Sequence, residues 1–144
     1  RVAVHPPTGR VRILQSIQAA DAGTVLNEQQ CRGQVEGGAT QAVGSALYEE
    51  MILVDGVVQT DILRNYHIPR LSDSPRTEVL FADTYDRLGP SGAKSMSESP
   101  YNPVAPAIAN AIRDATGVRI RQLPMNPARV WAALHQNGGG SASS

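Results

Sequence analysis

The chain of 144 residues contains a single cysteine, Cys31. It therefore cannot form an internal disulfide or a zinc site built from several cysteines. A reducing, cytoplasmic location is the expectation that follows. No apolar stretch is long enough to span a membrane, and the first residues lack the charged and then apolar segments of a signal peptide. The sequence thus predicts a soluble protein that does not associate with membranes.

The chain also lacks an excess of charge, because 13 Lys and Arg residues balance 13 Asp and Glu residues. Neither sign forms a long run, which disfavours binding to nucleic acid through broad electrostatic attraction. His5, His67 and His135 are far apart and have no neighbouring ligands at metal-binding spacing. A metal ion held by protein side chains is therefore not expected.

Aromatic residues are scarce, at 4% of the chain with one Trp and one Phe, which is little for a self-sufficient core. The chain begins at Arg1 with strand-like residues, and its last residues, QNGGGSASS, have the composition of a flexible linker. We therefore expect a C-terminal part of a longer polypeptide, or a subunit of a complex. Residues 1–134 would form the folded part and residues 135–144 a flexible tail.

The first half of the sequence predicts two strands and one long helix. Strands are expected over 1–4 and 10–19, on either side of the turn HPPTG. Asn27, with Gln30 three residues later, is a typical helix start. Apolar residues then recur every three or four positions from Cys31 to Met51, which predicts a helix over 28–51. Four glycines in this helix, at positions 33, 37, 38 and 44, suggest that a backbone or a ligand approaches closely.

The second half predicts shorter elements. A hairpin is expected over 52–63 around Asp55 and Gly56, followed by the extended segment NYHIP over 65–69. Strands are predicted over 77–82 and 118–123, and helices over 103–116 and 127–134, with an irregular segment over 83–100. The expected class is α+β, with a mixed sheet, one long glycine-rich helix and a second, alanine-rich helix.

The irregular segment contains the stretch GPSGAKSMSESPYNP, in which Glu98 stands among glycines, serines and prolines. Such a loop cannot readily form a helix or a strand, so Glu98 is either a surface residue or a functional carboxylate near the start of the following helix. Lys94 precedes it by four residues, in a segment whose backbone amides could bind an anion. Gln41 lies among the helix glycines and could reach a polar ligand, although a solvent-facing glutamine is the simpler interpretation.

Three motifs together resemble one enzyme family. They are QVEGG-x-x-Q-x-x-G over 34–44, Y-x-I-P over 66–69 and G-x-K-x-x-x-E-x-P over 92–100, followed by an alanine-rich helix. In this order and spacing the sequence resembles the C-terminal part of the large subunit of the molybdenum hydroxylases, the xanthine dehydrogenase and aldehyde oxidase family. The resemblance covers residues 1–134. By this resemblance, the Y-x-I-P motif is expected to form a strand.

The resemblance implies a molybdenum–molybdopterin cofactor to which no side chain of the protein is a metal ligand, and leaves open whether the pterin carries a cytosine dinucleotide. It implies that Glu98 is the general base in the oxidative hydroxylation of an aldehyde, purine or N-heterocycle with oxygen from water. Gln41, Met96 and Ser97 correspond to residues close to the cofactor. Iron–sulfur (2Fe-2S) and FAD groups would be bound by other domains or subunits, which with the rest of the large subunit are the expected partners.

The sequence departs from the family pattern next to the glutamate. The family usually has glycine before it and proline directly after it, whereas this chain has Ser97 and Ser99, with Pro100 one position later. The family's large subunit is also much longer, so the isolated chain is expected to be inactive. Two alternatives stay open at this point: a catalytically inactive structural or interaction domain with the same fold, and a small binder of organic anions.

Overall fold

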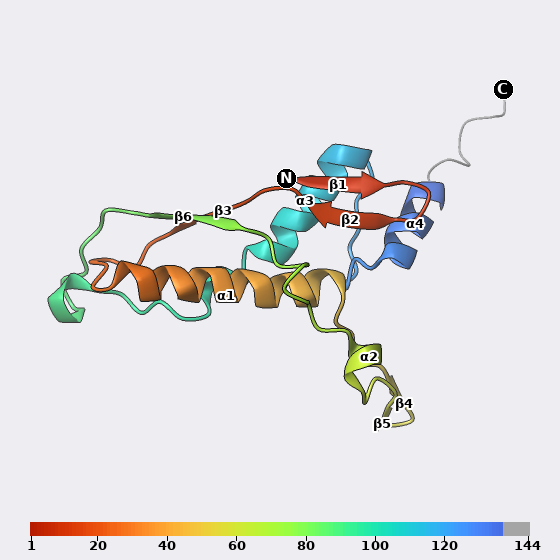
Figure 1. Cartoon of the computed structure of the whole chain (residues 1–144), viewed down its shortest axis with the longest axis horizontal. Helices are drawn as coiled ribbons and strands as arrows, with labels where there is room; N and C mark the ends of the chain where they lie inside the picture. Colours follow the sequence, from red (N-terminus) through yellow and green to blue (C-terminus); the bar gives the residue numbers. More distant parts are fainter. Residues whose placement is uncertain (137–144) are drawn as a thin grey trace.

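The structure is a computed structural model that describes residues 1–136. Its elements are β1 (Val2–His5), β2 (Arg10–Ile13), β3 (Ser16–Ala20), α1 (Glu28–Leu47), β4 (Leu53–Val54), β5 (Val57–Val58), α2 (Leu63–Tyr66), β6 (Thr77–Phe81), the 3-10 turns η1 (Pro90–Gly92) and η2 (Ser99–Tyr101), α3 (Val104–Thr116) and α4 (Pro127–Gln136). Figure 1 shows α1 along the length of the molecule, with the β1–β2 hairpin, α3 and α4 gathered near one end. The α+β prediction is confirmed.

Helix α1 begins where the sequence predicts it. The Asn27 side chain accepts a hydrogen bond from the Gln30 amide at 3.0 Å, which caps the first turn. The helix ends at Leu47, four residues before the predicted end, because the amides of Tyr48 and Glu49 both bond to the Gly44 carbonyl. Met51 is consequently outside the helix and 62% exposed, so its assignment to the buried helical face is wrong.

The predicted N-terminal hairpin is confirmed, since β1 and β2 pair antiparallel with Val2 opposite Ile13. The single strand predicted over 10–19 is wrong. The amides of Leu14 and Gln15 both bond to the Arg1 carbonyl, which ends the hairpin ladder. The chain then forms β3, which pairs in parallel with β6. Parallel strands need a long crossover connection, and here it contains α1. Parallel and antiparallel pairing thus occur in separate two-stranded sheets, so residues 1–136 do not form the predicted mixed sheet.

The predicted hairpin after α1 is present but short, with β4 and β5 of two residues each. Asp55 and Gly56 both have positive φ, as a type I′ turn requires. The extended segment predicted from Asn65, which the resemblance treats as a strand, is wrong. Leu63–Tyr66 form the helical turn α2, and His67 follows with φ 60°. Proline restricts only the residue directly before it, so Pro69 does not prevent a helical turn that ends at Tyr66.

The C-terminal part contains two helices. Strand β6 and helix α3 occupy the predicted positions, and Gly117 ends α3 with φ 76°. The strand predicted over 118–123 is wrong, because the structure of residues 1–136 places no strand beside it. The segment leads instead to Met125, whose amide bonds to the Ala46 carbonyl of α1 at 2.7 Å. Helix α4 includes positions 135 and 136, and the rest of the predicted tail, residues 137–144, lies outside the described residues.

The buried core joins α1, α3 and α4 and is aliphatic. Its residues are Val43, Ala46, Leu47, Ile108, Ile112, Met125 and Val130. Arg129 of α4 closes one end of it through an ion pair of 2.6 Å with Glu50. This packing gives α1 a fixed position, and the remaining surface of α1 receives the loop that contains Glu98.

Candidate functional site

The loop that contains Glu98 is attached at its start by backbone hydrogen bonds to the segment after β3. The Lys94 amide bonds to the Ala22 carbonyl at 2.8 Å, and the Thr24 amide bonds to the Gly92 carbonyl at 2.9 Å. Gly92 has φ 79°, and a Cβ there would lie 2.3 Å from ring carbons of Tyr85. Only glycine fits both the backbone conformation and the space at this position.

A carboxylate holds the same end of the loop. Asp21 forms an ion pair of 2.5 Å with the Lys94 ammonium group. It also accepts hydrogen bonds from the Thr84 hydroxyl and from the Gly23 amide. The Lys94 hydrogen bond, followed by those from Thr84 and Gly23, holds the pKa of the Asp21 carboxyl well below its ordinary value of 3.8. Lys94 is thus paired with a carboxylate of its own chain, which makes it an anchor of the loop.

The far end of the loop packs on α1. Pro100 is buried, and a Cβ at Gly38 would lie 3.3 Å from the Pro100 Cβ and 3.5 Å from the Tyr101 amide nitrogen. The Gln18 side chain donates a hydrogen bond of 3.0 Å to the Pro100 carbonyl. The loop is therefore held on both sides of Met96, Ser97 and Glu98.

Between these anchors, the predicted site residues face outward to different degrees. Met96 is half-buried, whereas Ser97 and Glu98 are exposed. Within residues 1–136 the Glu98 carboxylate forms neither an ion pair nor a hydrogen bond, and it does not cap the short turn η2 that follows it. Met96 accepts a weak hydrogen bond from the Ser99 hydroxyl at 3.4 Å. The structure thus leaves the Glu98 carboxylate available to a group from outside this chain.

Gln41 lies on α1 one turn after Gly38, the residue on which the loop packs, and it is exposed. No hydrogen bond in the described part of the chain joins its side chain to the loop. Gly33, Gly37 and Gln41 are spaced by four residues and so share one face of the helix. A Cβ at Gly33 or Gly37 would meet no atom within 4 Å, whereas one at Gly44 would lie 2.8 Å from Pro69. The chain's own packing therefore explains the glycines at 38 and 44 and leaves those at 33 and 37 facing open space.

A hollow of about 520 Å³ lies beside the anchored end of the loop. Its wall includes Gly33 and Gln34 of α1 together with Lys94 and Met96 of the loop. A polar group that entered this hollow would meet both the glycine face of α1 and the backbone that leads to Glu98.

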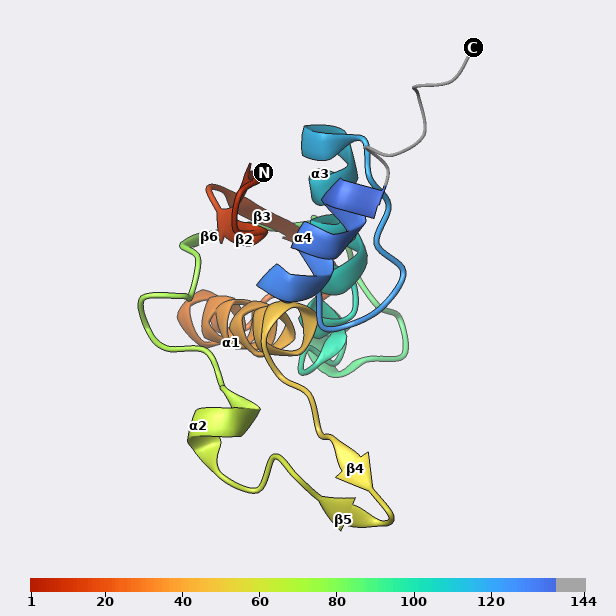
Figure 2. The same ribbon diagram turned by 90° about the vertical axis from the view of Figure 1, so that its right-hand side faces the viewer.

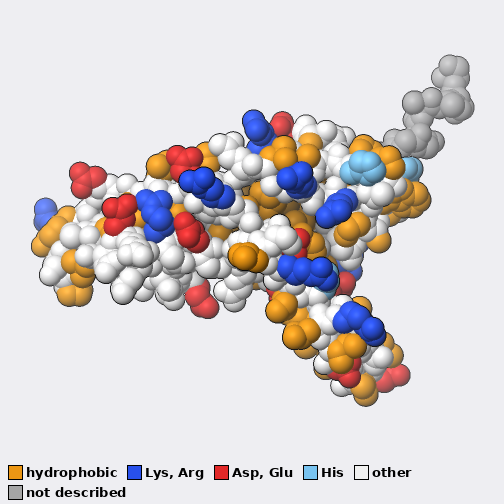
Figure 3. All heavy atoms as spheres, in the orientation of Figure 1, with side chains coloured by type: hydrophobic (Ala, Val, Ile, Leu, Met, Phe, Trp, Pro, Cys, Tyr) orange, Lys and Arg blue, Asp and Glu red, His pale blue; other side chains and the backbone are white. Residues whose placement is uncertain are grey.

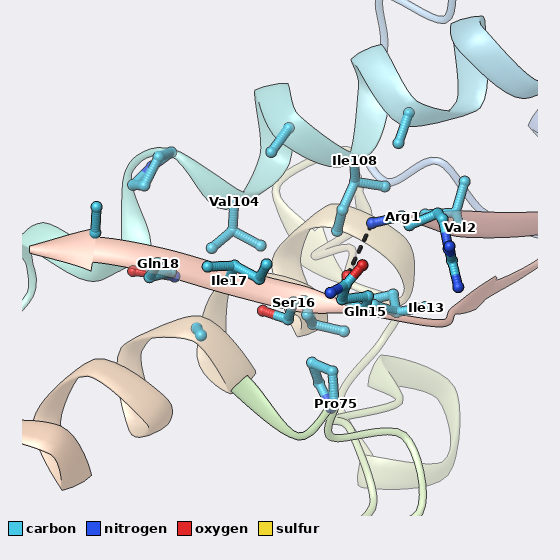
Figure 4. Close-up of a pocket in the computed structure, with 16 residues that line it drawn as sticks. Arg1, Val2, Ile13, Gln15, Ser16, Ile17, Gln18, Pro75, Val104 and Ile108 are labelled. Carbon is cyan, nitrogen blue, oxygen red and sulfur yellow. Dashed lines mark hydrogen bonds between the residues drawn. The ribbon is translucent and has the colours of Figure 1, made fainter. Parts of the chain in front are cut away.

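A second cavity, of about 250 Å³, lies between β3 and α3 and is shown in Figure 4. Ile17, Val104 and Ile108 point into it, and its lining contains none of the four predicted site residues. This cavity is therefore part of the packing between strand and helix, and it adjoins the candidate site only through Gln18, which anchors the loop at Pro100.

In residues 1–136 no helix is both long enough and apolar enough to cross a membrane. Over the same residues, no three His, Cys, Asp or Glu side chains come together in a way that could hold a metal ion.

Sequence reasoning missed Asp21, Gln18 and the contact between Gly38 and Pro100. The stretch DAGT does contain a signal for the first of them, because an aspartate two residues before a glycine often accepts the glycine amide in an Asx turn. The structure shows this bond at 3.0 Å. The partners of Gln18 and Gly38 are more than 60 positions away along the chain, so no local pattern could identify them.

Comparison with known proteins identifies the family. Residues 1–75 match the family model described as a molybdopterin cofactor-binding domain. The xanthine dehydrogenase molybdenum-binding subunit of Escherichia coli O157:H7 is 39% identical over 131 residues, which are 90% of this chain and 17% of that subunit. The aldehyde oxidoreductase molybdenum-binding subunit PaoC of Escherichia coli strain K12 is 38% identical over 127 residues, covering 86% of this chain and 17% of the relative.

Solved structures agree with these sequence matches. Quinoline 2-oxidoreductase from Pseudomonas putida 86 superposes with a TM-score of 0.87 and 31% identity, over 94% of this chain and 18% of that one. The aldehyde oxidoreductase from Desulfovibrio desulfuricans ATCC 27774 superposes with a TM-score of 0.85 and 32% identity, over 92% of this chain and 14% of that one. The chain therefore spans less than a fifth of the length of these relatives. It belongs to the molybdopterin cofactor-binding domain family and corresponds to part of the large subunit of the molybdenum hydroxylases, the xanthine dehydrogenase and aldehyde oxidoreductase family.

Proposed function

We propose that this chain supplies the general base and part of the cofactor-facing wall of a molybdenum hydroxylase that oxidises an aldehyde, a purine or an N-heterocycle. The observation that supports this most directly is the position of Glu98. Its carboxylate is exposed and unpaired within the described residues, on a loop that the chain's own contacts hold at both ends. It also occupies the glutamate position of the G-x-K-x-x-x-E-x-P motif.

The surface around Glu98 fits a large polar cofactor held mainly by other parts of the subunit. Gly33 and Gly37 leave space on the α1 face that Gln41 shares, and the hollow beside Met96 continues from that face. Gln41, Met96 and Ser97 would hold the cofactor here, the first through its amide and the other two through the loop backbone. When bound, the molybdenum–pterin cofactor supplies the oxidising power for the hydroxylation.

The part of Glu98 in this reaction is to accept a proton. A general base acts only within hydrogen-bond distance of the proton that it removes, so the position of the loop matters as much as the carboxylate itself. The Asp21–Lys94 ion pair fixes the loop before the glutamate, and the packing of Pro100 on Gly38 fixes it after the glutamate. The two anchors together limit how far the carboxylate can move during turnover.

The same proposal names the partners of the chain. The relatives are named as molybdenum-binding subunits, and we propose iron–sulfur and flavin groups on other domains or subunits as the electron acceptors. The proposal is compatible with a pterin that carries a cytosine dinucleotide and with one that does not. Release of a cytosine nucleotide on hydrolysis of the extracted cofactor tests for the dinucleotide form, and its absence would leave the simple pterin.

The test is Glu98→Gln in the full-length subunit, purified with the subunits that accompany it. Positioned proton transfer contributes about 10² to 10⁴ in rate, so the variant should lose hydroxylation by a factor in this range and keep its molybdenum and pterin. Glu78→Gln is the matched control, because Glu78 is an exposed carboxylate on β6. Equal turnover in the wild type and in Glu98→Gln would overturn the assignment of the base.

An inactive structural domain is the competing function, and Ser97 favours it because the family usually has glycine there. Serine enters positive φ less readily than glycine, and Ser97 does not adopt positive φ in this structure, so the loop differs from one that holds a glycine in that conformation. Metal and pterin analysis separates the two functions. A well-folded full-length protein without molybdenum and pterin would establish the inactive domain, whereas about one molybdenum per large subunit would support the hydroxylase.

A further inference from the structure

A segment of the chain stands away from the rest of the molecule. We call residues 51–68 the arm; it contains β4, β5 and α2 and projects from the end of α1 in both ribbon views (Figures 1 and 2). Nine of the eighteen large hydrophobic side chains that are exposed in the described residues belong to it: Met51, Ile52, Leu53, Val54, Val57, Val58, Ile62, Leu63 and Ile68. Half of the exposed apolar side chains thus lie in about an eighth of the chain.

The surface of the arm is poor in charge as well as rich in apolar groups. Its charged residues are Asp55, Asp61 and Arg64. Figure 3 shows apolar side chains along the arm, with the few charged groups between them. Large contiguous apolar patches on soluble proteins mark surfaces that contact another polypeptide or a membrane. The composition of the arm therefore indicates a contact surface.

The base of the arm is firmly attached to the body. Glu50, just before the arm, pairs with Arg129 of α4 at 2.6 Å. The rings of Tyr48 and His67 meet edge to face with centroids 5.3 Å apart. Pro69 packs directly on Gly44 of α1, where a Cβ would lie 2.8 Å from the proline ring. These contacts fix the direction in which the arm leaves the body.

The outer part of the arm has little structure of its own to stabilise it. Its sheet pairs only Leu53 with Val58 and Val54 with Val57. Two-stranded hairpins are at best marginally stable in water unless they pack on another element. A fixed base with a short apolar hairpin at the end is the arrangement expected of a segment that another surface covers.

The arm lies within the part of the chain that its relatives share. The family match over residues 1–75 includes the whole arm. The superposition on quinoline 2-oxidoreductase leaves out 6% of this chain, about nine residues, so at least half of the eighteen-residue arm is aligned. That structure is much longer, since this chain covers 18% of it. The arm is therefore a feature of the domain itself, and its occupant should be something that every such large subunit contains.

We propose that the arm inserts its apolar side chains into an apolar recess formed by the part of the same large subunit that lies outside residues 1–144. The arm then joins this domain to the rest of its own polypeptide. This inference does not depend on Glu98 or on turnover. The arm follows the C-terminal end of α1, whereas Ala22 and Thr24, which hold the start of the Glu98 loop, lie before its N-terminal end.

The first test is a photo-crosslinking residue, p-benzoylphenylalanine, placed at Val57 of the full-length subunit in its complex. Mass spectrometry should identify cross-links from this position to peptides of the same polypeptide outside residues 1–144. The same residue at Asp114, an exposed position on α3, is the control for non-specific capture. Cross-links only to a second copy, only to another subunit, or no more than at Asp114 would each overturn the proposal.

A pair of substitutions at the same site gives an independent readout. Val57→Asp should lower the melting temperature of the full-length subunit, since it would bury a carboxylate in an apolar recess, whereas Val57→Ile should leave it nearly unchanged. If Val57→Asp does not fold, cross-linking still decides the proposal, because the cross-linking variant changes only position 57 and introduces no charge into the arm. Equal melting temperatures for Val57→Asp and the wild type would show that the arm is not covered.

Discussion

The contact between Gly38 and Pro100 predicts that the size of the side chain at position 38 controls the position of Glu98. In Gly38→Ala the new Cβ lies 3.3 Å from the Pro100 Cβ, which the loop can accommodate by moving a few tenths of an ångström. Alanine is also favoured over glycine in a helix by about 1 kcal/mol, so the variant should be close to the wild type in stability. In Gly38→Val the two methyl groups extend a further bond length of about 1.5 Å towards Pro100.

The valine methyl groups leave no space for Pro100 in its present position, so the loop must move by about 1 Å. Overpacking of this kind costs about 1 to 3 kcal/mol of stability. A displacement of about 1 Å in a group that positions the reaction can reduce the rate by about 10²-fold, equivalent to about 2.7 kcal/mol of activation free energy. We therefore expect Gly38→Val to lose about two orders of magnitude in turnover and Gly38→Ala to lose little.

The assay measures turnover, molybdenum content and melting temperature of the full-length subunit in its complex. Glu36→Val is the matched control, because it places the same β-branched residue at an exposed position of the same helix. Turnover is compared per bound molybdenum, which separates loss of cofactor from misplacement of the loop. A Gly38→Val protein that is folded, loaded and as active as the wild type would refute the argument that Gly38 sets the position of the loop.

Three further predictions concern two anchors of the loop and the cap of α1, each measured in the full-length subunit. The lowered pKa of Asp21 stabilises the folded state above the ordinary value of 3.8, and this contribution is lost as the pH falls below that value. Asp21→Asn should therefore lower the melting temperature at neutral pH and reduce its decline in acid, and an unchanged profile would show that the Lys94 pair does not stabilise the fold. Gly92→Ala should cost about 1 to 3 kcal/mol through its positive φ and its clash with Tyr85, with a parallel loss of turnover; full activity would mean that the loop adapts. Asn27→Ala should cost about 1 kcal/mol and leave turnover unchanged, and a large loss of turnover would reveal a role for Asn27 beyond capping.

The elements that the sequence predicted well are those encoded by neighbouring residues. Asn27 caps α1, Gly117 ends α3, and Asp55 with Gly56 forms the hairpin turn, in each case through contacts within a few positions. Two of the failures depend on distant partners. The strand predicted over 118–123 has alternating residues but no strand beside it in the described part of the chain. The long strand over 10–19 was divided by hydrogen bonds to Arg1, a residue that its own pattern does not involve.

The four glycines of α1 show where sequence reasoning about the site reaches its limit. All four suggested a close approach, but sequence alone could not tell which neighbour approaches each one. The structure shows that Pro100 occupies the space at Gly38 and Pro69 the space at Gly44, so these two glycines are required by the packing of the chain itself. Gly33 and Gly37 contact nothing that would require glycine, although each costs about 1 kcal/mol of helix stability relative to alanine. No neighbour within this chain requires glycine at these two positions. The two glycines are therefore best explained by a group from the rest of the subunit that approaches α1 on the side of Gln41.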